Sequence, residues 1–315
     1  MGQLLYGRDI AARINNDIKE TVSEIQSTSG ITPKLALLTV DKGDTLKRSE
    51  LLLHENAARH LGIEVHTVVL NEDATDAELL RAIRDENEDP DVHGILILLP
   101  LPPQIDQDLV FQAIAPDKEI EGLSGDDDDE PIDLDNLDDL PEKQSSMIAA
   151  VRMLLESIDH DIPRSRNVFV TEAEIPDNPL VAKLLQMSSQ VSVPVAVVTT
   201  KDPNVRAVTR NADLVLVSVL SPEIVDDTFL KKGAVVIDFV PVMVGERYSE
   251  TKGRLVPILK GGVNVTAALR KASFVAPGVG GIGPIGVATM MRNLVVNCRN
   301  IALLGAGRAE YSSGR

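Results

Sequence analysis

The sequence predicts an α/β protein of two domains, each built on an open and mainly parallel sheet. Short apolar runs typical of strands alternate along the chain with amphipathic stretches typical of helices. The run from Gly94 to Leu99 is entirely apolar after its glycine, as expected for a strand that is buried on both faces of a parallel sheet. With 315 residues, the chain is long enough for two domains of ordinary size.

The first half of the chain predicts a helix followed by a β-α-β-α-β series. Apolar periodicity places helices at 10–25, 49–61 and 76–86, and strands at 35–40, 64–70 and 94–99. Gly62 suits the end of the second helix, and Thr75 suits the N-cap of the third. This order favours a parallel sheet with helices on its faces.

The second half repeats the alternation after a helix at 146–158. We expect strands at 168–170, 193–198, 214–219 and 234–239, helices at 179–188 and about 203–210, and a return loop or short hairpin at 250–260. A further strand, a glycine-rich turn and a long amphipathic helix follow. The stretch IALLGAGRA at 301–309 looks like a nucleotide-binding strand and turn, but only six residues follow it, so we interpret it as a tail.

The composition excludes several classes of protein. Acidic residues outnumber basic ones by 48 to 31, and the formal charge of −17 opposes binding to nucleic acid or to an anionic membrane. No apolar run approaches a membrane span, and the N-terminus lacks the apolar core of a secretory signal. The single cysteine, Cys298, indicates a reducing compartment: the cytoplasm, with an organelle matrix left open. The five histidines form no metal-binding pattern, so no metal is expected.

Two unusual stretches each leave an alternative open. The acidic segment 125–143 predicts a solvated loop or linker, and the alternative is a calcium site, although it lacks the glycine and final glutamate of a helix–loop–helix calcium loop. The glycines of 278–283 follow an expected strand and precede a helix in which Pro284 suits the first position. They predict either a rigid loop against a ligand or a plain tight connection.

Several motifs, taken together and in order, resemble the bifunctional methylenetetrahydrofolate dehydrogenase/cyclohydrolase family over nearly the whole chain. These are GRDIAARI, DVHGILILLPLP, PDKEIEG, NADLVLVSV, KKGAVVIDF and GGIGPIGVATMMRN. The resemblance implies a catalytic-type α/β domain at 1–145, a Rossmann-like domain for NADP at 146–275, and a loop and helix at 276–315 that pack on the first domain. It also implies oxidation of methylenetetrahydrofolate by hydride transfer, hydrolysis of the methenyl product, and a dimer.

The chain departs from the family at the implied catalytic positions. Counting back from Leu61-Gly62, the family's tyrosine and its acid–base lysine correspond to Glu50 and His54. The glutamine before the family's LPLP is Leu98, and the aspartate that holds the pterin is Glu121. The family's VPGGVGP segment is largely kept, which implies substrate contacts from Gly280, Gly281, Gly283 and Pro284. Glu50, one helical turn from His54, either raises the pKa of that histidine and forms a modest ion pair with it, or lies with it on a solvated helix face.

The turn that would hold the cofactor phosphates departs further. It reads Thr171-Glu172-Ala-Glu174-Ile-Pro-Asp177-Asn-Pro179, and only the final proline of the family motif remains. Phosphate binding needs free N–H groups or positive charge, and three acids supply neither. The sequence therefore predicts that no cofactor binds.

Two functions stay open. The first is a pseudoenzyme with a structural, assembly or regulatory role, as a homodimer or as a subunit of a larger assembly. The second is an active folate enzyme that binds a folate, or another small molecule, in the cleft between its domains and uses His54 as its acid–base group.

Overall fold

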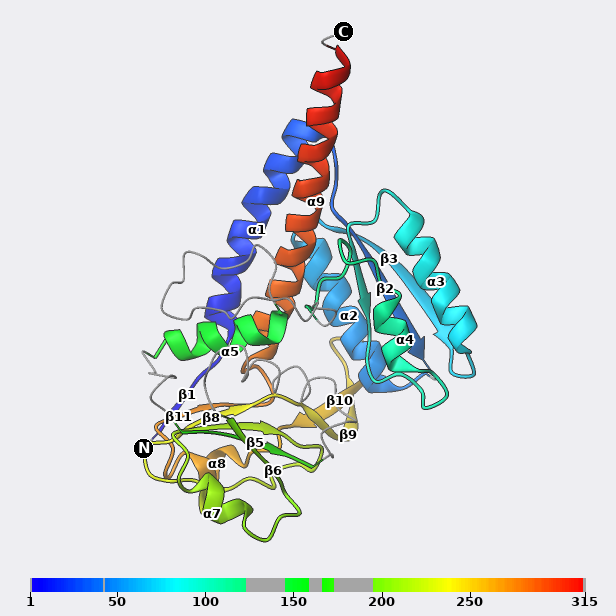
Figure 1. Ribbon diagram of the computed structural model, residues 1–315. Coiled ribbons are helices and arrows are strands. Elements are labelled where there is room, and N and C mark those ends of the chain that lie inside the picture. The colour runs from blue at the N-terminus through cyan, green and yellow to red at the C-terminus, as the bar shows by residue number, and fades with distance from the viewer. Residues whose placement is uncertain (1, 42, 123–144, 159–165, 173–194, 314–315) are drawn as a thin grey trace. The chain divides into compact units, whose positions relative to one another are not determined.

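The computed structural model describes residues 2–41, 43–122, 145–158, 166–172 and 195–313, with the side chains of the last helix described as far as residue 302. The acidic segment 125–143, the expected helix 179–188, and Glu174, Asp177 and Pro179 lie outside the described residues. Two compact units make up the chain (Figure 1). The three-stranded unit comprises Ala12–Gly125, Pro141–Ser146 and Val287–Arg315, and the six-stranded unit comprises Met1–Ala11, Asp126–Leu140 and Met147–Gly286.

The three-stranded unit has a parallel sheet of order β3-β2-β4, as its apolar runs predict. Its strands are β2 (Lys34–Asp41), β3 (Glu64–Asn71) and β4 (Gly94–Ile97). Its helices are α1 (Arg8–Ser29, from Ala12 on), α2 (Thr45–His60), α3 (Asp76–Glu88), α4 (Gln107–Gln112) and α9 (Gly283–Ser313, from Val287 on).

Alternation along β2 divides the core of this unit into two layers. Leu35 and Leu37 pack in a cluster that includes residues of α1, α2 and α9, whereas Ala36 and Leu38 pack in a cluster that includes residues of α3 and α4. All four are fully buried. Successive side chains of a strand point to opposite faces, so one apolar strand supplies both layers.

Both ends of α3 are capped by side chains. Thr75 caps the N-terminus, as the sequence predicts, and a lysine that the sequence did not indicate caps the C-terminus. Thr75 and Glu78 form a reciprocal capping box at the N-terminus. At the C-terminal end, the Lys118 ammonium donates to the main-chain oxygens of Glu86, Asn87 and Asp89, at 3.0, 2.8 and 2.6 Å. Carbonyls there have no partner within the helix, and a cation is the favoured group to satisfy them.

The six-stranded unit has a sheet of order β1-β11-β8-β7-β5-β6, in which all neighbours are parallel. Its strands are β1 (Gln3–Leu4), β5 (Asn167–Thr171), β6 (Val195–Thr199), β7 (Leu214–Ser218), β8 (Val235–Asp238) and β11 (Phe274–Ala276), and its helices are α5 (Ser146–Glu156, from Met147 on), α7 (Val205–Thr209) and α8 (Val265–Ala268). Residues 1–11, which the resemblance assigns to the first domain, group with this unit in the structure, because β1 pairs with β11 and extends the sheet.

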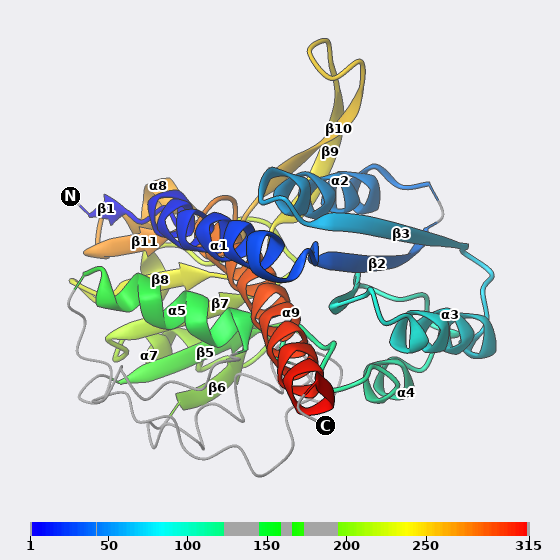
Figure 2. The same cartoon turned by 90° about the horizontal axis from the view of Figure 1, so that it is seen from above.

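Of the two alternatives for 250–260, the structure contains the hairpin, which is longer than expected. It is an antiparallel ribbon of β9 (Val242–Ser249) and β10 (Arg254–Lys260) that extends away from the six-stranded sheet (Figure 2). The IALLGAGRA stretch continues α9 as a helix. No helix of the described chain has the length and apolarity that crossing a membrane requires.

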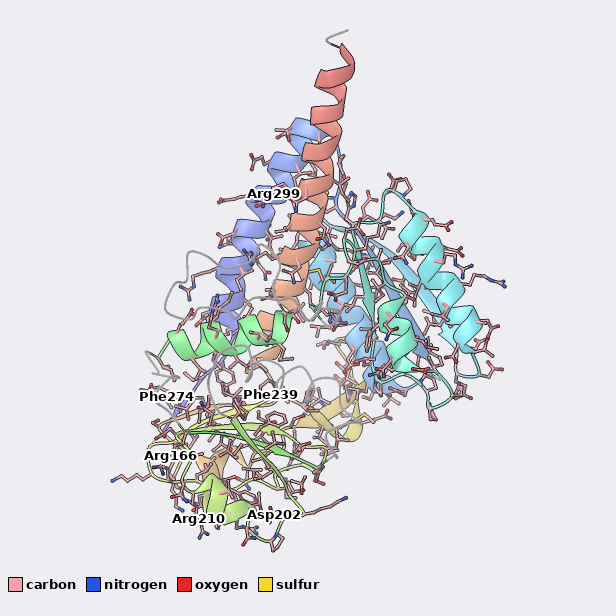
Figure 3. All side chains as sticks on the ribbon, in the orientation of Figure 1. Arg166, Asp202, Arg210, Phe239, Phe274 and Arg299 are labelled. Carbon is pink, nitrogen blue, oxygen red and sulfur yellow. The ribbon has the colours of Figure 1, made fainter. Side chains whose placement is uncertain are left out.

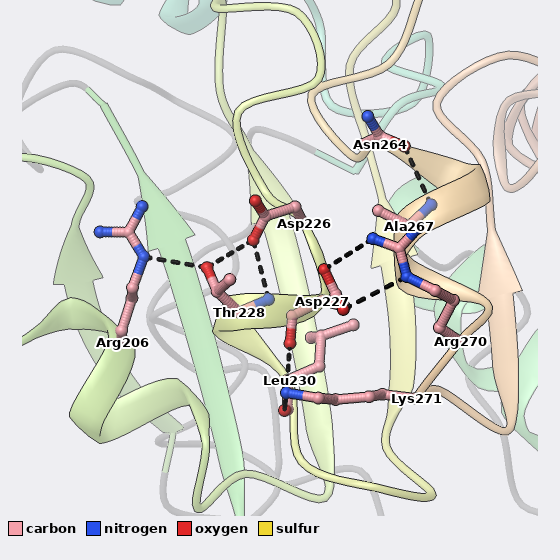
Figure 4. Close-up of polar contacts among 9 residues, drawn as sticks. All are labelled: Arg206, Asp226, Asp227, Thr228, Leu230, Asn264, Ala267, Arg270 and Lys271. Carbon is pink, nitrogen blue, oxygen red and sulfur yellow. Dashed lines mark hydrogen bonds and ion pairs between the residues drawn. The ribbon is translucent and has the colours of Figure 1, made fainter.

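Charged contacts fix a short 3-10 helix, η3 (Asp227–Phe229), within the six-stranded unit (Figure 4). Arg270 donates to both carboxylate oxygens of Asp227, at 3.0 and 3.3 Å, and its neighbour Lys271 donates to the main-chain oxygen of Asp227. The guanidinium of Arg206, on α7, lies 4.5 Å from the centre of the Phe229 ring. These contacts hold α7, η3 and α8 together under the sheet.

Candidate active site

A cavity of about 660 Å³ lies in the three-stranded unit, where β2 ends and α2 begins. Its wall comprises Val40, Asp44, Lys47, Glu72, Asp73 and the segment 100–104. These residues lie at or just beyond the carboxyl ends of β2, β3 and β4. The crevice at the carboxyl ends of parallel strands is where α/β proteins most often bind ligands.

Lys47 is the buried cation of this wall. The Asp44 side chain accepts a hydrogen bond from the Lys47 main-chain N–H at 2.7 Å and caps α2, which places Lys47 in the first helical turn. The side chain is only 7% exposed, and its Nζ donates to the main-chain oxygen of Leu98 at 2.9 Å. A cation in the first turn opposes the helix dipole, so this position is not one that helix stability favours.

Lys47 and Glu50 lie one helical turn apart and affect each other's protonation. Burial lowers the pKa of Lys47, and the carboxylate of Glu50 is the strongest influence in the opposite direction. Burial also raises the pKa of Glu50 to about 7, against the opposing effect of Lys47. Near neutral pH, burial therefore disfavours the charged form of both side chains.

His54 occupies a different environment from the one the sequence predicts. It lies two turns beyond Lys47 on the buried stripe of α2, is 9% exposed, and does not line the cavity. Its Nδ1 lies 2.9 Å from the main-chain oxygen of Glu50, as a hydrogen bond donated by the ring to its own helix. Burial lowers the pKa of His54, and the hydrogen bond to the Glu50 main chain opposes this shift without reversing it.

Leu98 and Glu121 play different parts. The Leu98 side chain is buried in the apolar layer shared with α1, α2 and α9, and its carbonyl supplies the polar contact, to Lys47. Glu121 does not line the cavity, and its main-chain N–H donates to the Glu119 carboxylate at 2.6 Å. Burial, reinforced by Glu119, raises the pKa of Glu121 to about 8, so its carboxyl is largely neutral at pH 7.

The glycine-rich loop is packed closely within the six-stranded unit. A Cβ on Gly281 would lie 2.3 Å from the main-chain oxygen of Pro277, whereas one on Gly283 would meet nothing within 4 Å. Gly280 has a φ of +82°. The main-chain N–H of Gly7 donates to the carbonyls of Gly280 and Gly281. Backbone conformation and packing therefore explain Gly280 and Gly281 without a ligand, and Gly283 is the open position at the start of α9, with Pro284 in its first turn.

The six-stranded sheet has a switch point of strand order at β5, since β6 lies on one side of it and β7 on the other. Nucleotides bind at such points in doubly wound sheets. Here the Glu172 carboxylate, which follows β5, accepts hydrogen bonds from the main-chain N–H groups of Leu220 (2.7 Å) and Ser221 (2.9 Å) beyond β7. The carboxylate is thus bound to two backbone donors of a kind that also bind phosphate.

The remaining described groups at this edge include one exposed cation, next to an acid, Asp202. Thr171, the last residue of β5, is fully buried, and Lys201 is exposed just beyond β6, the strand after which such folds recognise the adenosine ribose. Phe239 and Asp202, which follow β8 and β6, mark this edge in Figure 3. The edge therefore combines a switch point, backbone donors and a cation.

Sequence reasoning missed Lys47, Asp44 and Lys201. The signal for the first two was present as an Asp-x-x-Lys start to α2, in which a lysine stands where an acidic residue is usual. Counting back from Leu61-Gly62 assigns the catalytic positions to residues 50 and 54 instead. Among the described residues, no group of acids, histidines and cysteine could hold a metal ion.

Comparisons with known proteins agree with this architecture. Residues 5–121 match the family model "Tetrahydrofolate dehydrogenase/cyclohydrolase, catalytic domain", and residues 145–302 match its NAD(P)-binding domain. The chain is 32% identical over 303 residues to the bifunctional protein FolD of Lactobacillus gasseri, covering 95% of this chain and 98% of that protein. Solved structures of similar fold include the FolD enzymes of Campylobacter jejuni (27% identity, TM-score 0.74, 95% of this chain and 99% of that one) and Trypanosoma brucei (25%, 0.78, 95% and 98%).

These comparisons overturn the prediction that no cofactor binds. The second half of the chain matches an NAD(P)-binding domain, and the T. brucei structure is a complex with NADP. In physical terms, the prediction treated Glu172 as a free negative charge, whereas its carboxylate is already bound to two backbone N–H groups.

Proposed function

Because this chain belongs to the tetrahydrofolate dehydrogenase/cyclohydrolase family, we propose that it is an active enzyme of folate one-carbon chemistry. It oxidises methylenetetrahydrofolate with NAD(P) and hydrolyses the methenyl product. The observation that carries the proposal is the buried Lys47 ammonium in the wall of a cavity at the carboxyl ends of β2, β3 and β4. A buried lysine whose pKa is lowered by burial and which lines a cavity is the kind of group that catalytic sites use.

The surroundings of the cavity suit a reduced folate. The segment 100–104, with its three prolines, provides a rigid apolar wall, and Asp44, Glu72 and Asp73 provide acceptors for the N–H groups of a pterin. A pterin presents a flat ring with several donors on one edge, which matches an apolar wall beside carboxylates.

NAD(P), when bound, would supply the hydride acceptor, and the switch point of the six-stranded sheet is where this chain would hold it. The main-chain N–H groups of Leu220 and Ser221 and the Lys201 ammonium are the groups in this chain that would hold its phosphates. Glu172 competes for the same two N–H groups. Cofactor binding is therefore expected to displace the Glu172 carboxylate.

The experiment measures both reactions with the purified chain. Reduced cofactor is followed by its absorbance with methylenetetrahydrofolate and either NADP or NAD, and methenyltetrahydrofolate is followed by its decay above the spontaneous rate. A mock preparation from host cells that lack the chain controls for host enzymes. We expect both rates to exceed the mock. A chain that folds but shows neither rate would contradict the proposal and favour the non-catalytic function.

A further inference from the structure

We propose that the side-chain amine of Lys47, with Glu50 as its partner, is the group that takes up and returns protons at the folate in this cavity, and that His54 is not. This inference rests on the proposed function and deepens it. It changes the residue to which the acid–base role belongs, since counting along the sequence placed that role at position 54.

The first support is the fixed position of the Lys47 side chain. Asp44 holds the first turn of α2, the carbonyl at the end of β4 accepts one of the three protons of the ammonium, and the side chain forms part of the cavity wall. Both anchors belong to the ends of regular elements. An amine held in this way is aligned before a substrate arrives.

The second support is the exclusion of His54 from the cavity. Seven residues along a helix correspond to roughly 10 Å along its axis, and His54 lies that far beyond Lys47 on the same stripe. Its ring is enclosed, and one nitrogen is bound to the main chain of Glu50. A base must reach the proton that it abstracts, and the buried His54 ring does not reach this cavity.

The third support is the charge around the amine. Glu50, Asp44 and Asp41 each raise the pKa of the amine, and Glu72 and Asp73, in the loop after β3, line the same cavity. The acids attract a proton to the site, while burial opposes charge on Lys47 and Glu50 alike. Burial therefore favours the state with a neutral amine and a protonated carboxyl, which has the same net charge as the pair of ions.

The hydrolytic step can be written with this amine alone. A water oxygen bonds to the methenyl carbon, the C=N π pair moves onto nitrogen, and a proton of the water passes to Lys47. The C–N bond then breaks with its electron pair on nitrogen, and Lys47 returns the proton to that nitrogen. The hydroxyl group releases its own proton to solvent and becomes the formyl carbonyl.

The test compares Lys47→Gln, Lys47→Arg and His54→Asn in the full chain, with Lys232→Gln at an exposed site as the matched control. We expect Lys47→Gln to lower kcat of the hydrolysis about 100-fold or more, with KM and the melting temperature little changed. Lys47→Arg keeps the charge but releases no proton at neutral pH, so it should not restore the rate. His54→Asn should retain the rate to within a few-fold. A wild-type rate in Lys47→Gln, or a loss in His54→Asn as large as that expected for Lys47→Gln, would overturn the inference.

A second measurement separates this inference from the proposed function. Acetic anhydride labels uncharged amines, and peptide mass spectrometry reports the extent at Lys47 with and without 5-formyltetrahydrofolate, a stable reduced folate. We expect the folate to protect Lys47 and to leave Lys232 equally labelled. Labelling of Lys47 that the folate does not change would overturn the inference, even in a chain with full activity. Absence of both reactions in the wild type, with Lys47 protected, would count against the proposed function alone.

Discussion

The Nζ atom of Lys47 lies 2.9 Å from the main-chain oxygen of Leu98, and this hydrogen bond joins the first turn of α2 to the end of β4. The sequence has an apolar side chain at position 98, where a polar side chain would be expected in the family. The structure supplies the polar contact from the backbone instead. The Leu98 side chain cannot accept a hydrogen bond, but the Leu98 carbonyl accepts one from the buried Lys47 ammonium.

The stability of the fold should depend on pH through Glu121. Its pKa in the folded chain is about 8, above the ordinary value of 4.5, so between these values the folded state binds more protons than the unfolded state. The free energy of unfolding must then fall as pH rises through this window, by at most about 1.4 kcal/mol per pH unit from one group. Glu121→Gln, which keeps the shape and cannot ionise, should flatten the decline in urea unfolding measured from pH 5 to 9. An unchanged slope would show that this carboxyl is not held neutral.

Lys118 should be a major stabilising residue of the three-stranded unit. Its ammonium satisfies three carbonyls at the end of α3 and is 6% exposed. Lys118→Met fills the same space and removes the donor from the Glu86 and Asn87 carbonyls, whereas Asp89 keeps the N–H of Val92, at an expected cost of about 2–4 kcal/mol in the free energy of unfolding. The exposed Lys252→Met, in the turn of the β9–β10 ribbon, should change it by less than about 0.5 kcal/mol. Equal effects of the two substitutions would refute the capping role.

Glu172 should limit cofactor affinity. Its carboxylate occupies the N–H groups of Leu220 and Ser221, so a cofactor phosphate must displace a negative charge to reach them. Glu172→Gln removes the charge, and about 1 kcal/mol of relieved repulsion corresponds to a roughly fivefold tighter Kd for NADP by calorimetry. Glu250→Gln, at an exposed position, serves as the control. Weaker or equal binding by Glu172→Gln would show that the phosphates lie elsewhere.

The glycine loop offers a paired test of packing against ligand contact. Gly281→Ala would bring its Cβ within 2.3 Å of the Pro277 carbonyl, and we expect a loss of about 1–3 kcal/mol in the free energy of unfolding. Gly283→Ala meets open space and should leave stability within about 0.5 kcal/mol. Thermal or urea unfolding of the two variants checks both values. A tolerated Gly281→Ala would mean that the loop relaxes.

Regular apolar patterns made most of the fold predictable. The apolar run of β2 and the Thr75 N-cap of α3 are local signals, and the structure contains both elements. The pairing of β1 with β11 could not be predicted, because two residues carry no periodicity and the partner strand is about 270 positions away. The ribbon of β9 and β10 was underestimated because the polar and exposed residues of β9 give no period-2 signal.

The candidate site was less predictable than the fold, for a geometric reason. Positions 50 and 54 were inferred by counting along one helix. Which residue of that helix lines the cavity, Lys47, depends instead on where α2 begins and on which segments cover its buried face. The Asp44 cap determines the first of these, and the end of β4 determines the second. Neither is visible from the spacing of residues within α2 alone.

The pH dependence of the hydrolysis rate tests the proton pair of Lys47 and Glu50 most directly. With the spontaneous rate subtracted, kcat of the wild type should rise as pH passes about 7, where Glu50 ionises and the pair is left with one proton. In Glu50→Gln this rise near pH 7 should disappear, because only the amine then titrates. A rise near pH 7 that persists unchanged in Glu50→Gln, and disappears instead in His54→Asn, would contradict the account.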